Sequence, residues 1–259
     1  MARNILILTG DQIRHQWFCH QLSKNFPVQA VFAESFQYPE PKPQSEQERV
    51  SWDWFFSRRQ KYENKHFRIA PGTLPENRPE IIPVSQGKLN FPKTLAQIKS
   101  FAPDIILVYG TSILGTDLLE QFPRSILNLH VGLPRYYRGS SCNVWPIYNS
   151  ELNYLGACVH YVDAGIDTGE ILAQASIDIS LDDDEQDIAG KTLLLGVELM
   201  VSVVKNWQDE IVGPVQENIK GKLYLMKDFT PAVTLKIKQS VESGALKKMI
   251  VSRRAENSQ

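Results

Sequence analysis

Short, largely apolar runs separated by helical patterns constrain the fold of this chain more than any other feature. Residues 3–9 are rich in Ile and Leu and end at Gly10, residues 28–33 are similar, and a helical pattern fills residues 14–24 between them. Residues 104–109, Asp-Ile-Ile-Leu-Val-Tyr, are the clearest run of this kind. Strands without polar alternation are buried on both faces, as in parallel sheets covered by helices. The order strand, helix, strand therefore predicts an α/β fold with a mostly parallel sheet and helices on both faces.

Length and charge narrow the class of protein. The chain has 259 residues and a formal net charge of −1, so it can form one large domain with a small appendix, and its charge does not favour nucleic acid or an anionic membrane. No apolar run approaches the ~18 residues of a membrane span, and residues 5–8 are too short for a signal peptide. The three cysteines are widely spaced, which argues against a disulfide framework. We expect a cytoplasmic protein.

The chain divides into a main domain over residues 1–207, with an aromatic-rich insertion near residues 35–90, and a small C-terminal α+β subdomain over residues 208–259. Within the main domain, the other predicted helices cover residues 92–101, 117–121 and 188–207, and the other predicted strands cover 126–129, 157–162 and 175–179. A loop is predicted over 35–50, irregular chain over 71–92 and a solvated acidic cap over 182–185. The C-terminal part is predicted to contain strands over 211–216 and 222–225, one lysine-rich helix over 233–250 and a disordered tail from Ser252. The helix over 188–207 and the C-terminal pieces are candidates for a homodimer surface.

Residues 50–67 are aromatic and charged and are predicted to form a helix in the insertion. One interpretation is a helix that packs its aromatic side chains on the domain. The other is a substrate wall, in which aromatic rings stack on a base or sugar and Arg58 or Arg59 pairs with phosphate. The sequence leaves both interpretations open.

The turn after the first strand contains Gly10 and Asp11 and lacks the G-x-G-x-x-G pattern of dinucleotide-binding turns. Its backbone N–H groups could still bind an anion of the substrate, and Arg14 or His15 could add charge. The alternative is an ordinary turn with a solvated arginine.

The turn after residues 104–109 is built from small residues and continues through Ile113 and Leu114 to Gly115. Ligands of open parallel sheets lie beyond the carboxyl ends of the strands. This turn could therefore hold a flat, partly apolar ring, although Ile113 and Leu114 could also be core residues at the start of a helix.

Polar side chains follow two further strand ends. Asn128 and His130 lie two residues apart on a predicted strand, so they project from the same face. The strand over residues 157–162 ends in a glycine-spaced acidic turn that carries Asp167. An adjacent strand end could bring this turn beside the first strand, and we expect the three polar residues to form an active site there.

These residue types suit the transfer of an acyl-type group to a nucleophile that the substrate supplies. The imidazole handles a proton, the carboxylate orients the imidazole and favours its charged form, and the amide donates to the oxyanion of a tetrahedral intermediate. No Ser or Cys is placed as a nucleophile, since Ser140, Ser141 and Cys142 lie beyond the basic loop at residues 135–139. The five histidines lack metal-ligand spacing, so no metal is expected.

The same motifs resemble those of a known family. Three motifs in this order look like those of the formyltransferase family that uses 10-formyltetrahydrofolate. They are Asn128-Leu129-His130, Arg138-Gly139, and the run from Val159 to Gly169 with Asp163-x-Gly165-x-Asp167. The similarity covers about residues 3–205 and is most specific over 103–172. It implies a Rossmann-like sheet with the site at the strand ends.

The resemblance also implies roles for individual residues. Asn128, His130 and Asp167 match the catalytic triad of the family, and the cosubstrate is 10-formyltetrahydrofolate, with no metal. The residues implied to bind this cosubstrate are Tyr109, Gly110, Ser112, Ile113, Leu114, Val162, Asp163 and Ala164.

The loop after His130 departs from the family pattern. The usual run Pro/Ala-Ser-Leu-Leu-Pro is replaced by Val131-Gly132-Leu133-Pro134-Arg135, which resembles the sugar-modifying branch. We therefore expect Arg135 and Arg138, with Gly10, Asp11 and Arg14, to bind the acceptor.

The expected acceptor is the primary amine of a nucleotide-linked amino sugar. One alternative acceptor is methionyl-tRNA, but the near-neutral charge and the short C-terminus argue against it. The other alternative is that the protein is a non-catalytic module that binds nucleotide or folate.

Overall fold

A seven-stranded sheet with the order β3-β2-β1-β4-β5-β7-β8 forms the centre of the computed structural model, which describes residues 3–70, 78–207 and 221–256. The first five strands in this order run parallel, and β7 and β8 are antiparallel to their neighbours. The strands are β1 (Ile5–Gly10), β2 (Val28–Glu34), β3 (Glu80–Val84), β4 (Ile105–Tyr109), β5 (Ile126–His130), β7 (Gly156–Tyr161) and β8 (Ile171–Ser176). The prediction of a mostly parallel α/β sheet is confirmed.

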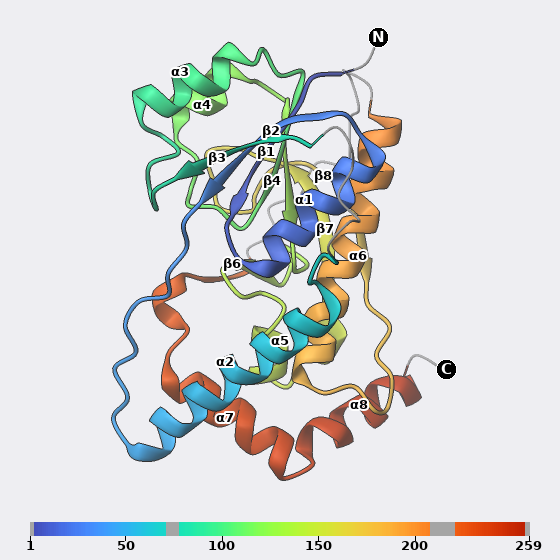
Figure 1. The fold of residues 1–259 in the computed structure, drawn as a ribbon. Coiled ribbons are helices and arrows are strands. Elements are labelled where there is room, and N and C mark those ends of the chain that lie inside the picture. The colour runs from blue at the N-terminus through green and yellow to red at the C-terminus, as the bar shows by residue number, and fades with distance from the viewer. Residues whose placement is uncertain (1–2, 71–77, 208–220, 257–259) are drawn as a thin grey trace.

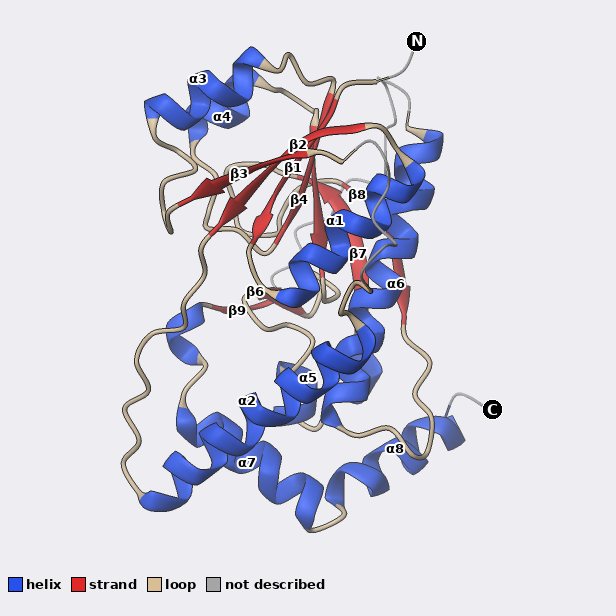
Figure 2. Ribbon diagram, viewed as in Figure 1, coloured by secondary structure: helices blue, strands red, loops and turns tan. Residues whose placement is uncertain are grey.

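Helices cover both faces of this sheet, because each buried strand sends alternate apolar side chains to opposite sides. Helices α1 (Ile13–Asn25) and α6 (Glu185–Asn206) pack on one face, where Leu22 and Met200 are fully buried. Helices α3 (Pro92–Ser100) and α4 (Thr116–Gln121) pack on the other face, over residues such as Leu6 and Ile106. Figures 1 and 2 show the two pairs on opposite sides of the strands.

A third layer lies beyond the carboxyl ends of the parallel strands and is mainly helical (Figure 1). Its apolar cluster joins Phe55 of the insertion, Trp145 of the central stretch and Ile237 of the C-terminal segment. The layer contains α2 (Glu46–His66), α5 (Trp145–Tyr148), α7 (Pro231–Glu242), α8 (Ala245–Glu256) and the 3-10 turns η1 (Leu152–Tyr154) and η2 (Met226–Asp228). The sheet and this layer therefore meet at the edge where the sequence predicts the site. The domain boundary at residue 207 stays a prediction.

Two edge strands differ from the sequence prediction. Strand β3 lies within the segment that was expected to be irregular, and its Pro83 is tolerated because an edge strand does not need every backbone N–H. Strand β8 covers Ile171–Ser176 rather than residues 175–179. The apolar signal at Ile177 and Ile179 is real, but these side chains are buried in the third layer after the strand has ended.

The C-terminal segment also departs from its prediction. The single helix expected over residues 233–250 is two helices, because the chain turns at Gly244, which has a φ of +74°. The tail predicted to be disordered from Ser252 continues α8 to Glu256, and Arg253 is buried and donates to the carbonyl of Ile177. The strand predicted over residues 211–216 lies outside the described residues.

Strand β9 (Lys222–Tyr224) pairs in parallel with β6 (Tyr137–Gly139), which forms in the loop after His130. The strand predicted over residues 222–225 is confirmed as β9. Its partner β6 was not predicted, since a run of three residues in a loop is too short to show a strand pattern.

The acidic run before α6 is more than a solvated cap. Asp184 caps the helix through the backbone N–H groups of Gln186 and Asp187, as expected. However, the Glu185 side chain is fully buried and pairs with Arg58 at 2.5 Å, and Arg58 also pairs with Asp184 at 2.6 Å. Glu185 can be buried because α2 packs beside the start of α6 and Arg58 supplies the opposite charge.

No helix within residues 3–70, 78–207 and 221–256 is long and apolar enough to cross a membrane.

Candidate active site

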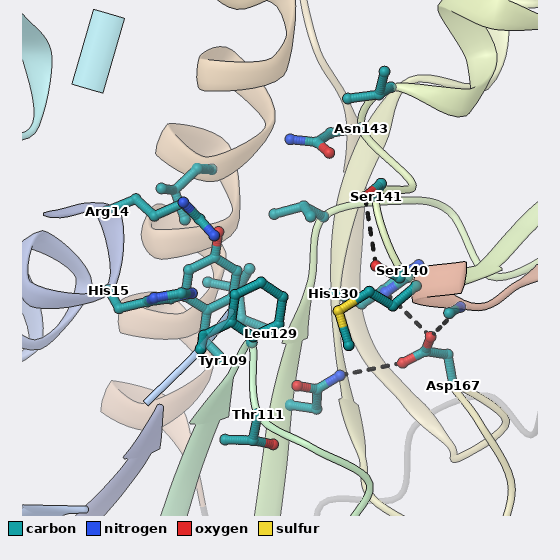
Figure 3. Close-up of a pocket in the computed structure, with 18 of the residues that line it drawn as sticks. Arg14, His15, Tyr109, Thr111, Leu129, His130, Ser140, Ser141, Asn143 and Asp167 are labelled. Atoms are coloured by element: carbon teal, nitrogen blue, oxygen red, sulfur yellow. Dashed lines mark hydrogen bonds and ion pairs between the residues drawn. The ribbon is translucent and has the colours of Figure 1, made fainter. Parts of the chain in front are cut away.

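A cavity of about 580 Å³ lies between the carboxyl edge of the sheet and the third layer. Strands β4 and β5, the loops that follow β4 and β7, and helices α2 and α6 contribute to its walls. Asn128, His130 and Asp167 all line it, as Figure 3 shows for the latter two. The three residues that were singled out from strand ends are therefore brought together at one ligand-sized cavity.

Asp167 is the centre of this group. Its Oδ1 accepts from Asn128 Nδ2 at 3.2 Å, and its Oδ2 lies 3.3 Å from His130 Nδ1. The backbone N–H of Gly139 donates to Oδ2 at 2.7 Å. Asp167 adopts a φ of +49°, a left-handed conformation that Asp tolerates better than most residues. The turn therefore presents the carboxylate to the side chains of Asn128 and His130 on β5.

His160 is a fourth polar member of the group, and no role was predicted for it. In the antiparallel pair of β5 and β7, Asn128 lies directly opposite His160. The two side chains meet at 3.1 Å, and His160 Nε2 lies 3.3 Å from Asp167 Oδ1. His160 Nδ1 lies 2.7 Å from the carbonyl oxygen of Tyr161, so Nδ1–H donates there and Nε2 can accept from Asn128. A prediction that the strands carrying Asn128 and His160 pair in antiparallel would have identified His160, because this pairing places the two residues opposite each other.

The protonation states follow from burial and from these contacts. Burial opposes ionisation of Asp167, but His130, His160 and the N–H of Gly139 hold the pKa of its carboxyl well below its usual range. Burial lowers the pKa of His130, and Asp167 opposes that shift. An ionised carboxylate therefore faces a neutral imidazole, and the other ring nitrogen of His130, Nε2, lies 3.0 Å from the carbonyl oxygen of Tyr137. Both nitrogens of a protonated His130 would find an acceptor, which suits a group that takes up a proton transiently.

The loop after β4 forms one wall of the cavity and is held in place by Glu34 at the end of β2 and by Asn90 at the end of the insertion. The buried carboxylate of Glu34 accepts from Ser112 N at 2.7 Å, from Ser112 Oγ at 2.8 Å and from Gly87 N at 2.6 Å. Asn90 donates to the carbonyl of Ile113 at 2.8 Å and accepts from Gly115 N at 2.6 Å. The sequence did not indicate either residue, because both act on backbone groups more than twenty positions away.

Most residues predicted to bind the cosubstrate line this cavity. They are Tyr109, Gly110, Ser112, Ile113, Leu114, Val162 and Asp163, whereas Ala164 is exposed and is not part of the lining. Asp163 uses its carboxylate within its own turn, where it accepts from Gly165 N and from Thr168 Oγ1. The assigned binding roles stay predictions.

The residues predicted to bind the acceptor are more scattered, and of them only Arg14 lines the cavity. Gly10 is packed beneath the ring of His15, and Asp11 accepts from the N–H of Phe36. Arg135 is exposed to solvent, and Arg138 contacts the backbone carbonyls of Gly221 and Ile166.

His15 does not add the positive charge that was considered for it. Its ring is buried between Gly10 and Gly110, and Nδ1 accepts from the N–H of Gln12. Burial, with added repulsion from Arg14 and Arg59, lowers the pKa of His15 well below its usual range, so the side chain is neutral.

The helix over the insertion packs aromatic side chains on the molecule and also lines the cavity, and its role as a substrate wall stays a prediction. Phe55, Arg59 and Tyr62 of α2 line the cavity, whereas Trp52 and Phe56 pack with Tyr38 and the C-terminal Phe229.

Within the described part of the chain, no group of three or more His, Cys, Asp or Glu side chains is arranged to hold a metal ion. The nearby thiols of Cys142 and Cys158 are fully buried, and burial raises the pKa of each well above its usual range. Neither thiol is suited to act as a nucleophile.

Comparisons with known proteins agree with this geometry. The family model described as formyl transferase matches residues 59–204, more than half of the chain. A methionyl-tRNA formyltransferase of Geobacter metallireducens is 38% identical over 119 residues, which are 45% of this chain and 38% of the relative. One from Anaeromyxobacter dehalogenans is 32% identical over 151 residues, 57% of this chain and 48% of the relative. The chain thus spans less than half the length of these curated relatives.

Solved structures share the fold. A sugar N-formyltransferase from a Shewanella species superimposes with a TM-score of 0.55 at 14% identity, covering 91% of this chain and 87% of the other. An N-formyltransferase from Helicobacter canadensis, solved with folinic acid and dTDP-3-aminofucose, gives a TM-score of 0.52 at 18% identity, covering 91% of this chain and 79% of the other. With the family model matching most of the sheet and the polar strand ends, this chain belongs to the formyltransferase family.

Proposed function

We propose that the protein transfers the formyl group of 10-formyltetrahydrofolate to a primary amine of a small molecule. The observation that carries the proposal is the meeting of Asn128, His130 and Asp167 on one wall of the cavity. An amide donor, an imidazole and an ionised carboxylate are the groups that acyl transfer to an amine needs. No nucleophilic side chain is required, because the acceptor amine is the nucleophile.

The reaction forms one C–N bond and breaks another. The amine nitrogen attacks the formyl carbon, and the formyl oxygen becomes an oxyanion. The oxyanion accepts from Asn128 Nδ2 in exchange for one of the two hydrogen bonds that this nitrogen makes to Asp167 and His160. His130 takes the proton that the attacking nitrogen loses, while Asp167 orients the imidazole and stabilises its charged form. Collapse of the intermediate breaks the bond to N10 of the cosubstrate, His130 returns its proton to N10, and tetrahydrofolate leaves.

The cosubstrate is proposed to bind along the loop after β4 and the start of the loop after β7. The apolar side chains of Leu114 and Val162 and the backbone around Gly110 line this part of the cavity. A flat ring can lie between two such loops, with hydrogen bonds to backbone groups, and the contacts of Glu34 and Asn90 keep one loop in place.

The proposed acceptor is a nucleotide-linked amino sugar. Aromatic residues with Arg14 and Arg59 line the remaining part of the cavity, and the neighbour from Helicobacter canadensis was solved with dTDP-3-aminofucose. The curated relatives are named for methionyl-tRNA, which makes that acceptor the second candidate. A net charge of −1 gives little attraction to the phosphate backbone of a tRNA.

A product screen by mass tests the proposal. The protein is incubated with 10-formyltetrahydrofolate and a panel of dTDP- and UDP-amino sugars, and the expected result is a gain of one formyl group on one of them. Formylation of charged initiator tRNA, with a strong dependence on salt, would instead favour the second candidate. Folate binding without turnover of any amine would point to a non-catalytic module and would overturn the proposal.

A further inference from the structure

Two arginines and one carboxylate meet in the part of the cavity that α1 and α2 line. Arg14 Nη1 lies 2.9 Å from Glu63 Oε1, and Arg59 Nε lies 3.8 Å from the same oxygen. Arg59 Nη1 also donates to the hydroxyl of Tyr38 at 3.0 Å. The side chains of Arg14 and Glu63 are only 15% and 9% exposed, and that of Arg59 is 21% exposed. One carboxylate therefore serves two largely buried guanidinium groups.

Neighbouring groups do not balance the surplus positive charge. Among the described residues that line the cavity, the other carboxylates belong to Asp163 and Asp167. Asp163 accepts hydrogen bonds within its own turn, and Asp167 faces His130 and His160. Unpaired charge is costly in a buried place, and a cavity that keeps it is prepared for a ligand of opposite sign.

Nearby titratable groups respond to the same charge. Burial would raise the pKa of Tyr38, but Arg59 and Arg14 lower it below its ordinary value. Burial lowers the pKa of His15, and Arg14 and Arg59 lower it further. Both effects are those of a net positive field at this end of the cavity.

The position of the cluster relative to the proposed reaction centre is shown in Figure 3. Arg14 and Tyr109 lie on one side of the view, and His130 and Asp167 lie on the other. Phe36, Phe55 and Phe67 add apolar walls around the arginines. A ligand that reaches both ends would place a charged group at the arginines and a second group at the triad.

We infer that the amine acceptor carries a compact anionic group, a phosphate or a carboxylate, that binds to Arg14 and Arg59 while its amine lies at Asn128 and His130. The inference rests on the proposed function. The planar guanidinium of each arginine matches the oxygens of either anion, and such charge-assisted hydrogen bonds fix orientation as well as affinity. Arg14 and Arg59 thereby select acceptors that have the amine and the anion at opposite ends.

The competing explanation is that the cluster only joins α1 to α2. Arg59 also lies over the rings of Phe56, at 4.4 Å, and Tyr38, at 5.0 Å, so it would contribute to packing without any ligand. This explanation predicts that anions bind to the wild type and to the arginine variants with equal affinity.

Binding of small probes in the presence of saturating folinic acid distinguishes an anion site from a cluster that only joins α1 to α2. Titration calorimetry is performed with dTDP as the phosphate source, D-glucuronate as the carboxylate source and D-glucose as the neutral probe. We expect one of the anions to bind to the wild type more tightly than glucose, and Arg14→Gln and Arg59→Gln each to raise its Kd by roughly tenfold or more. Arg49→Gln is the matched control, because Arg49 lies on the same helix and pairs with Glu46 at the surface.

Folding is checked separately. Arg14→Gln alone leaves the buried Glu63 with one distant partner, so the double variant Arg14→Gln/Glu63→Gln removes the pair without a stranded charge. Equal anion affinity in the wild type and folded Arg59→Gln and double variants, or no preference for either anion over glucose, would overturn the inference. Loss of the proposed function gives a different result, since folinic acid would then fail to bind to the wild type or no amine would be formylated.

Discussion

At the scale of single residues, the site is a set of buried polar groups that hold one another in place. Asp167 contacts Asn128, His130, His160 and the N–H of Gly139 at distances between 2.7 and 3.3 Å. Each group is oriented by a neighbour rather than by solvent, which is the arrangement expected of a preorganised site. The consequence is that small changes in the group should affect turnover more than folding.

The first prediction concerns the triad. Asn128→Ala should lower kcat by roughly 10²–10³-fold, the cost of losing one oxyanion donor. His130→Ala should lower it by about 10²–10⁴-fold, the usual contribution of a general acid or base, and Asp167→Asn should lie in the same range. Turnover is measured with the acceptor that the mass screen identifies. Near-normal transfer by His130→Ala or Asp167→Asn would make the assignment wrong, and Asp182→Asn, an exposed acid before α6, serves as the control.

The second prediction concerns pH and rests on His15. The pKa of His15 in the folded state lies well below 6.5, so below pH 6.5 the unfolded chain binds a proton that the folded chain does not. Stability therefore falls as the pH is lowered through this window, by at most about 1.4 kcal/mol per pH unit for one such group. His130, whose pKa is also lowered, adds to the slope.

Urea unfolding of the wild type at several pH values between 7 and 5 measures this slope. His15→Gln should be less stable at pH 7, since the ring packs between two glycines, but its stability should depend less on pH. The same slope in both proteins would exclude His15 as its source.

At the scale of elements, the cavity wall after β4 is held by Glu34 at the end of β2 and by Asn90 at the end of the insertion. Glu34 lies at the end of β2, and its carboxylate reaches the backbone of the neighbouring loops at residues 87 and 112. A loop fixed in this way can receive a ligand without a further ordering cost. The end of β2 thereby contributes to the site although the sequence there shows no motif.

The third prediction tests this connection. Glu34→Ala leaves three donors without their acceptor and should destabilise the fold by about 1–3 kcal/mol. It should also weaken folinic acid binding by roughly tenfold, the equivalent of about 1.4 kcal/mol of lost preorganisation. Glu34→Gln keeps one acceptor oxygen and should show smaller effects on both. Calorimetry and urea unfolding provide the measurements, with the exposed Glu120→Ala as the control. Unchanged folinic acid affinity in a folded Glu34→Ala protein would contradict the prediction.

At the scale of the whole molecule, the C-terminal segment is connected to the triad through the pairing of β6 and β9. Gly139 has a φ of +91°, and a Cβ there would overlap the carbonyl oxygen of Tyr224. The N–H of the same residue donates to Asp167. The packing of the C-terminal segment and the orientation of the proposed catalytic carboxylate therefore depend on one position.

The fourth prediction compares two glycines of positive φ. Gly139→Ala combines the strain of a left-handed Ala with a steric overlap and should cost about 2–5 kcal/mol, with a loss of turnover even where the protein folds. Gly244→Ala has a similar φ of +74° but open space around its Cβ, so it should cost only about 1–2 kcal/mol and keep its turnover. Equal effects of the two substitutions on turnover would show that the connection is not functional.

The sequence alone was sufficient for the central strands and for the three polar residues at their ends. Residues 105–108 contain no polar side chain, so this run is buried on both faces, and the spacing of Asn128 and His130 places both on one face. These properties are local, because they depend on the strand period and not on which strand lies beside which. Asp167 was identified for the same reason, since the acidic turn that carries it is one continuous stretch of chain, and the family motifs gave it the same place.

Only the tertiary structure decided the partners of these residues. His160 is 32 positions from Asn128, Glu63 is 49 from Arg14, and Ser112 is 78 from Glu34, yet each pair is in hydrogen-bond contact. A periodic pattern records which face of an element is buried, but it does not record which strand pairs with it or which helix covers it. The edge strands β3 and β8, the pairing of β6 with β9 and the arginine cluster were invisible in the sequence for this reason. Side chains from distant segments met there only when the sheet and the third layer packed together.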